Sequence, residues 1–134
     1  MFQLDMKSGK SIYEQIIDNI KELIMTDVLA ENTRLPSVRT LSRQLTINPN
    51  TVQKAFKELE REGYIFTVSG RGTFVGPKSS IKADPAQVKS ALTDVISAFK
   101  QLLYLGLSPE DARDMSVSAI DALIGSVGKE KDYD

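Results

Sequence analysis

Residues 34–75 read RLPSVRTLSRQLTINPNTVQKAFKELEREGYIFTVSGRGTFV, and this stretch decides the fold. From Ser37 onward, Val38, Leu41 and Leu45 recur at spacings that suit one face of a helix. A serine directly before such a run is a favoured N-cap, because its hydroxyl accepts a hydrogen bond from a free amide of the first turn. We therefore predict a short helix that begins after Ser37.

A second, longer helix is predicted over residues 49–62. Asn48 is a good cap, and Pro49 then takes the first helical position, where its missing N–H costs nothing. Gly63 suits the position just past the helix end. The predicted buried face consists of Val52, Ala55, Phe56 and Leu59, and the opposite face of Asn50, Gln53, Lys54 and Lys57. Only a turn-sized gap separates the two helices.

A β-hairpin is predicted directly after this helix. Residues 64–68 and 73–75 are aromatic and β-branched, and the glycine-rich residues 69–72 join them. The plain interpretation of such a loop is a tight turn and nothing more. Arg71 at its tip, following two helices and a turn, favours a basic wing instead. A helix-turn-helix with a wing places one helix in a DNA groove, so the stretch predicts DNA binding.

The stretch resembles the winged helix-turn-helix of the GntR family of bacterial transcription regulators, and the run 48–55 is typical of its YtrA-type subfamily. Residues 12–16 also resemble the first helix of that family. The residues that carry the resemblance are Leu35, Pro36, Ser37 and Arg39, then Thr51, Val52, Ala55, Leu59, Glu60 and Gly63, then Gly70, Gly72, Thr73, Phe74 and Val75. This ordered series of motifs covers about a third of the chain.

The resemblance implies DNA contacts at the start of the first helix of the stretch, in the first turn of the second, and at the wing tip. The candidate residues are Arg34, Ser37, Arg39, Asn48, Pro49, Asn50, Thr51, Gln53, Lys54, Ser69, Gly70, Arg71 and Gly72. Many family members have arginines where this chain has Pro49 and Gln53. An arginine there would bind guanine, whereas the amides of Asn50 and Gln53 suit adenine N6 and N7. We therefore predict a preference for A·T-richer sites.

The charge of the whole chain does not favour nucleic acid, since the formal net charge is −1 and the pI about 5.5. Residues 34–71, in contrast, contain seven basic and three acidic side chains, a net charge of +4. The acids lie at the far end of the second helix, so phosphates can approach its first turn, where the helix dipole adds partial positive charge. A solvated charged face is the alternative. Beside the motif, we favour a phosphate-binding surface.

The chain has 134 residues with no cysteine and no histidine. Disulfides and thiolate metal sites are therefore excluded, and the commonest general base is missing. We expect no catalytic site, no metal and no cofactor, because the carboxylate pairs Asp111/Asp114 and Glu58/Glu62 have the helical spacing of solvated surface charges. The sequence has neither an apolar signal-peptide core nor an apolar run of membrane length. A cytoplasmic protein with no membrane segment is expected.

The predicted fold class is α+β. It comprises a winged helix-turn-helix domain of three helices and a β-hairpin over 1–76, a linker over 77–83, a small α-helical hairpin over 84–128 and a disordered tail over 129–134. Ser11 and Glu14 form a capping box for the first helix, whose broad apolar face should pack on the helix-turn-helix. Phe2 and Leu4 alternate with polar residues, which leaves a short strand and a flexible arm both open.

The C-terminal hairpin predicts a homodimer. Asp84 and Pro85 repeat the cap-plus-proline start, apolar residues then recur at spacings of four and three, and another helix begins after Ser108. The predicted interface consists of Val88, Leu92, Val95, Phe99, Leu102, Ile120 and Leu123. Two such helices do not enclose a substantial core alone, which favours assembly. A hairpin folded back onto the winged domain of a monomer is the alternative.

Together these features predict a sequence-specific transcription regulator, a repressor that binds a double-stranded DNA operator with an inverted repeat as a homodimer. The alternative is a winged-helix module that contacts protein or RNA. No dedicated effector pocket is visible in the sequence, although a cleft between the hairpin and the winged domain could bind a small-molecule effector.

Overall fold

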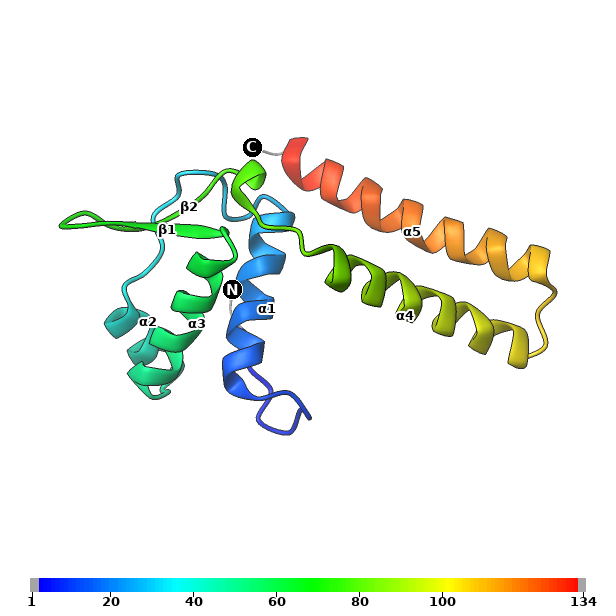
Figure 1. Cartoon of the computed structure of the whole chain (residues 1–134), viewed down its shortest axis with the longest axis horizontal. Coiled ribbons are helices and arrows are strands. Elements are labelled where there is room, and N and C mark those ends of the chain that lie inside the picture. Colours follow the sequence, from blue (N-terminus) through cyan, green and yellow to red (C-terminus); the bar gives the residue numbers. More distant parts are fainter. Residues whose placement is uncertain (1–2, 133–134) are drawn as a thin grey trace. The chain divides into compact units, whose positions relative to one another are not determined.

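The computed structural model describes residues 3–132, and their side chains as far as Ser126. The described elements are α1 (Ile12–Met25), α2 (Val38–Leu45), α3 (Pro49–Arg61), β1 (Ile65–Val68), β2 (Gly72–Val75), the short 3₁₀ helix η1 (Lys78–Ser80), α4 (Pro85–Tyr104) and α5 (Pro109–Asp132) (Figure 1). The chain forms two compact units, of which the first ends at Lys82 and the second begins at Ala83. The predicted α+β class is confirmed.

The helices begin where the sequence predicts, because each start has a side chain that accepts a hydrogen bond from an amide of the first turn. The five pairs are Ser11 Oγ with Glu14 N at 3.2 Å, Ser37 Oγ with Thr40 N at 3.0 Å, Asn48 Oδ1 with Asn50 N at 2.8 Å, Asp84 Oδ1 with Ala86 N at 2.9 Å, and Ser108 Oγ with Asp111 N at 3.1 Å. These caps satisfy donors that would otherwise lack a partner within the helix.

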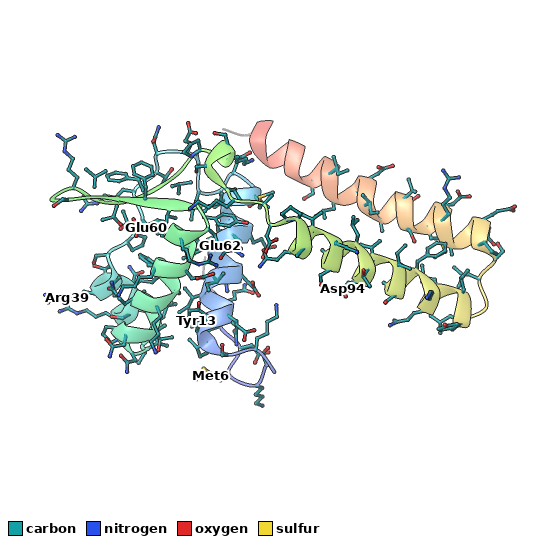
Figure 2. The ribbon with its side chains drawn as sticks, viewed as in Figure 1. Met6, Tyr13, Arg39, Glu60, Glu62 and Asp94 are labelled. Atoms are coloured by element: carbon teal, nitrogen blue, oxygen red, sulfur yellow. The ribbon has the colours of Figure 1, made fainter. Side chains whose placement is uncertain are left out.

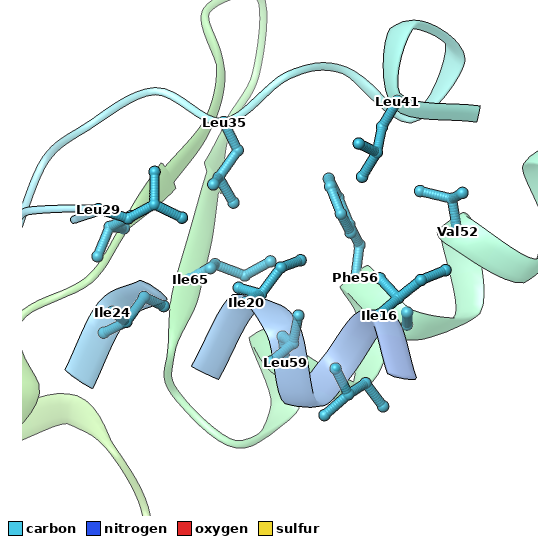
Figure 3. Packing of buried hydrophobic residues seen from close by; sticks show 13 residues of the cluster. Ile16, Ile20, Ile24, Leu29, Leu35, Leu41, Val52, Phe56, Leu59 and Ile65 are labelled. Atoms are coloured by element: carbon cyan, nitrogen blue, oxygen red, sulfur yellow. The ribbon is translucent and has the colours of Figure 1, made fainter. Parts of the chain in front are cut away.

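The core of the first unit lies where α1 packs on α3, with α2 and the base of the wing closing its sides (Figure 3). Ile16 and Ile20 of α1 and Val52 and Leu59 of α3 are fully buried. Leu41 of α2 also belongs to this cluster. The predicted buried faces of α1 and α3 are therefore confirmed, and the remaining face of α3 is left for solvent or a ligand.

The wing is an antiparallel hairpin with its base in the core and its tip in solvent. The register runs from Ile65 opposite Val75 to Val68 opposite Gly72, and both residues of the first pair are buried. Residues 33–35 add a short third segment along β2 that was not predicted. There Leu35 N donates to the carbonyl of residue 73 at 2.8 Å, and Val75 N donates to the carbonyl of residue 33 at 2.9 Å.

The N-terminal arm is neither of the two alternatives that the sequence leaves open. Its described part, from Gln3 onward, forms no strand, yet it is bound to α1 through the buried side chain of Gln15. Gln15 Oε1 accepts from Asp5 N at 2.7 Å, and Gln15 Nε2 donates to Asp5 O at 2.8 Å. This side-chain amide replaces the backbone partner that a strand would need. Phe2 lies outside the described residues.

The second unit is a helical hairpin made of α4 and α5. Among its described side chains only Ala112 is fully buried, and Phe99 and Leu102 are half-buried. The backbone of α5 runs to Asp132 and so overlaps the predicted disordered tail over 129–134. The last two residues of that tail lie outside the described residues. In the described part of the chain, no helix combines the length and the apolar character needed to cross a membrane.

The first unit extends further than the predicted domain boundary at residue 76. Residues 78–80 of the predicted linker form η1, and the compact unit reaches Lys82. The reason is that backbone and side-chain groups of this segment hydrogen-bond to the residues that follow α3.

Candidate nucleic-acid interface

The first unit presents three groups of the predicted residues, at the start of α2, at the start of α3 and at the wing tip. In the view of Figure 1, α2 and the wing extend from the same side of α1. Two of the predicted residues, Thr51 and Gly72, are half-buried. The others are exposed, namely Arg34, Ser37, Arg39, Asn48, Pro49, Asn50, Gln53, Lys54, Ser69, Gly70 and Arg71.

The turn between α2 and α3 is closed by backbone hydrogen bonds. Thr46 has a left-handed backbone, with φ 55° and ψ 50°, which is uncommon for a β-branched residue. Its amide donates to Arg43 O, and Ile47 N donates to Ser42 O at 3.0 Å. These bonds end α2 and turn the chain into α3 within three residues. A shallow open hollow is lined by this turn, the end of α2 and the start of α3.

The first turn of α3 combines the positive end of a helix dipole with exposed polar side chains. It contains no acidic residue, and a helix N-terminus favours a negatively charged ligand. Because Val52 and Ala55 face the core, Gln53 and Lys54 lie on the exposed side. Asn48 uses its Oδ1 for the cap, so its Nδ2 group is left as a donor. The start of α3 thus presents hydrogen-bond donors, amides and one positive charge together.

Ser37 is engaged by the structure of α2. Its Oγ accepts from Thr40 N at 3.0 Å and donates to Thr40 Oγ1 at 2.9 Å. Arg39, two residues further along, is exposed on the same first turn and is seen at the α2 edge of the unit in Figure 2. At this helix start, Arg39 therefore supplies the charge while Ser37 holds the helix end.

The wing tip places Arg71 on a turn that two glycines permit. Arg71 N donates to Val68 O at 2.9 Å and closes the turn. Gly70 and Gly72 have φ values of +78° and +122°, which favour glycine. The Arg71 side chain is exposed, so the tip carries a positive charge into solvent.

Arg34, one of the predicted DNA-contact residues, belongs to the wing rather than to the start of α2. Its backbone forms a bridge with Phe74 of β2. A Cβ built on Gly72 would lie 2.8 Å from Arg34 Nε, so the arginine side chain passes over this glycine. The pairing depends on contacts between residues about forty positions apart, which local sequence patterns do not reveal.

The acidic residues of α3 are bound within the unit. Arg61 forms an ion pair with Glu58 and donates hydrogen bonds to its carboxylate. These hydrogen bonds lower the pKa of the Glu58 carboxyl. Glu62 pairs with Lys21 of α1 at 3.3 Å, and Glu60 Oε1 accepts from Thr67 N at 3.2 Å. Figure 2 shows Glu60 and Glu62 at the end of α3 away from Arg39. The two carboxylates considered as a catalytic pair, Glu58 and Glu62, thus each neutralise a neighbouring cation.

The basic side chains of the three groups are exposed. In the described part of the chain, no ion pair involves Arg39, Arg43, Lys54 or Arg71. Among the same residues, no cluster of histidine, cysteine or carboxylate side chains is arranged to hold a metal ion. The arrangement supplies positive charge and hydrogen-bond donors to an extended anionic ligand.

The second unit exposes a large apolar surface. Of the predicted interface residues, Val88, Leu92, Val95, Ile120 and Leu123 are 50–66% exposed, while Phe99 and Leu102 are half-buried between the helices. Further exposed apolar residues, not assigned to the interface from the sequence, are Ile96, Tyr104, Leu105, Met115, Val117 and Ile124. Two of them, Ile96 and Ile124, directly follow predicted interface residues in the sequence.

The sequence and the fold match known regulators. Residues 12–75 match the family model described as "Bacterial regulatory proteins, gntR family". The chain is 45% identical to the HTH-type transcriptional repressor YtrA of Bacillus subtilis (strain 168) over 114 residues, which cover 82% of this chain and 85% of the relative.

Two solved structures have the same fold over most of the chain. The one titled "Transcriptional Antiterminator from Listeria monocytogenes EGD-e" has a TM-score of 0.71 and 35% identity, and the match covers 89% of each chain. YtrA from Sulfolobus acidocaldarius, described as a GntR-family transcription factor, has a TM-score of 0.60 and 31% identity, over 72% of this chain and 97% of that one. The chain therefore belongs to the GntR family of DNA-binding bacterial transcription regulators, in its YtrA-type subfamily.

Proposed function

We propose that this regulator is a cytoplasmic repressor that binds an inverted-repeat operator as a homodimer, with α3 in the major groove and the wing against the DNA backbone. The observation that carries the proposal is the first turn of α3. There, exposed amide side chains, an exposed lysine and the positive end of the helix dipole lie together, with no acidic residue among them. This combination suits a groove in which base edges lie between phosphates.

Base preference is assigned to Asn50 and Gln53. Both are exposed on the side of α3 opposite the core, and their amides suit the N6 and N7 atoms of adenine. Phosphate contacts are assigned to Arg39 at the start of α2 and to Arg71 at the wing tip, because both are exposed positive charges. Such contacts position a protein on DNA without reading the base sequence. Ser37 and Asn48 position these groups as caps.

A second copy of the chain is the partner proposed for the helical hairpin. Its apolar side chains remain more than half exposed along α4, as at Leu92 and Val95, and a single copy leaves them in water. Packing against a second hairpin would bury them. A two-fold dimer also brings two copies of α3 to two half-sites, which explains the inverted repeat of the proposed operator.

Salt dependence and base selection test this function together. The affinity of the full chain for a selected duplex should fall steeply as salt rises, because released counterions drive phosphate binding. Gln53→Ala should alter the preferred bases more than the overall affinity, whereas Arg39→Ala should weaken binding to every sequence. An unaltered preference in Gln53→Ala would remove the direct contact assigned to Gln53.

RNA is the second candidate ligand, because one of the similar structures is titled a transcriptional antiterminator. The same exposed basic residues would bind an RNA backbone. Competition decides between the two, since a duplex DNA operator should displace bound RNA if the chain reads base edges in the major groove, which RNA helices do not expose.

A further inference from the structure

The segment that leads from the wing to α4 is fastened to the end of α3. We call residues 76–82 the connector. At one end, Gly76 N donates to Tyr64 O at 2.9 Å, and at the other, Lys82 N donates to Glu62 O at 2.9 Å. The connector thus returns along the residues that follow α3, and its last residue is bonded to the residue that caps α3.

Ser80 holds the middle of the connector. Its Oγ lies 2.7 Å from Gly63 O and 2.6 Å from Pro77 O, both within hydrogen-bond distance. The Pro77 carbonyl also accepts from Ser80 N at 2.9 Å, whereas the hydroxyl is the connector group that reaches Gly63 O. A hydroxyl has one proton to donate. At any moment Ser80 Oγ therefore donates either to Gly63 O, after the end of α3, or to Pro77 O in its own turn.

Gly63 permits this contact to be close. Its backbone is left-handed, with φ +89°, and a Cβ built there would overlap the carbonyl oxygen of Ser80. The residue that follows the cap of α3 is therefore also the residue against which the connector packs. We call the bonds from Gly76, Ser80 and Lys82 to residues 62–64 the clasp.

The clasp leaves a very short joint between the two units. The first unit ends at Lys82, and α4 begins after its cap, Asp84, so only Ala83 and Asp84 remain between them. A free linker over 77–83 would span up to about 25 Å when extended, whereas two residues span about 7 Å. At 3.4 Å per base pair, the difference corresponds to roughly five base pairs along DNA.

We propose that the clasp, through Ser80, restricts the distance between the two half-sites that the dimer accepts. This inference rests on the proposed function, because it requires two copies bound to one operator. In it Ser80 is a positioning residue: it touches no DNA, and it acts by keeping the joint short. A dimer with the clasp intact accepts a narrow range of spacings, and a dimer without it accepts a wider one.

The experiment compares the full-length chain with Ser80→Ala, with Ser80→Thr as the conservative replacement and Ser79→Ala as the matched control. Ser79 is an exposed serine of the same 3₁₀ helix. Each variant is measured in two ways. Amide hydrogen exchange at Lys82 reports the clasp directly, and selection from duplexes in which two copies of the chosen half-site are separated by a variable number of base pairs reports the accepted spacing.

In the wild type, the Lys82 amide should be protected and one or two spacings should dominate. Ser80→Ala should speed exchange at Lys82 by about fivefold and broaden the selected spacings by several base pairs, with unchanged affinity for a single half-site. Ser80→Thr and Ser79→Ala should behave as the wild type does.

Three results would overturn the inference: an unprotected Lys82 amide in the wild type, unchanged protection in Ser80→Ala, or a faster amide with the same narrow spacing. A wild type that selects no DNA would instead reject the proposed function, and this outcome is visible before any variant is compared.

Discussion

At the scale of single residues, glycines with a left-handed backbone perform different tasks in this chain. Gly70 stands at the wing tip with no atom near the place of its missing Cβ, whereas Gly63 has the Ser80 carbonyl in that place. The sequence predicts Gly63 correctly as the residue after the helix end, because capping is local. It does not predict the close approach, which depends on the return of the chain after the wing.

This difference predicts unequal losses of stability. Gly70→Ala should lower the free energy of unfolding by about 1 kcal/mol, since it adds only the strain of a left-handed alanine. Gly63→Ala should cost at least about 3 kcal/mol, because the same strain is joined by overlap with a neighbouring backbone. Urea denaturation of both variants checks this order, and equal losses would mean that the connector does not pack against Gly63.

Two exposed arginines, Arg71 and Arg61, differ in whether their charge is available to DNA. Arg71 at the wing tip has no ion-pair partner among the described residues, whereas Arg61 at the end of α3 pairs with Glu58. Arg71→Ala should reduce the slope of log affinity against log salt by about one. Arg61→Ala should leave that slope unchanged. The reverse result, from binding titrations over a range of salt, would move the phosphate contact away from the wing.

At the scale of elements, the three helices of the first unit and the hairpin follow from local patterns in the sequence. Caps, apolar spacing and turn residues lie within a few positions of one another, so they can be read directly. The third segment of the wing and the clasp were not predictable in this way. Both consist of hydrogen bonds between residues far apart in the chain, such as Leu35 with residue 73 or Lys82 with Glu62.

The start of α3 allows folding and DNA binding to be separated at one position. Asn48→Ala removes the cap and should lower the free energy of unfolding by about 1 kcal/mol. Asn48→Asp keeps an acceptor for Asn50 N and suits the helix dipole, so stability should be retained. Its negative charge would face phosphate, however, and affinity for the operator should fall at least about tenfold.

Thermal unfolding and binding titrations of the two Asn48 variants provide the check. An aspartate variant that is both stable and fully active in binding would show that the start of α3 does not approach the DNA backbone.

At the scale of the whole molecule, the winged unit has a core of its own, whereas the helical unit exposes most of its apolar side chains. We call the dimer interface predicted on α4 and α5 the seam. Leu92 and Val95 lie at its centre, and their side chains remain 60% and 56% exposed in the single chain. The apolar spacing was therefore informative about which residues lack a partner within the chain. The partner that we propose for these residues is a second copy of the chain.

Charges placed on this seam should separate the copies. Leu92→Glu combined with Val95→Glu should give monomers in sedimentation velocity, with helix content retained because neither side chain is buried in the chain. Ser90→Glu combined with Ser97→Glu adds the same charge to α4 at exposed positions opposite the seam and should leave the dimer intact. A dimer that survives the first pair of substitutions would place the interface elsewhere.

The claim that this chain recognises a two-fold symmetric DNA sequence is tested most directly by selecting duplexes that bind the full-length protein from random DNA. The account predicts enrichment of an inverted repeat with A·T-rich half-sites, bound with an affinity that falls steeply as salt rises. Selected duplexes without a common sequence, bound equally at low and high salt, would contradict it.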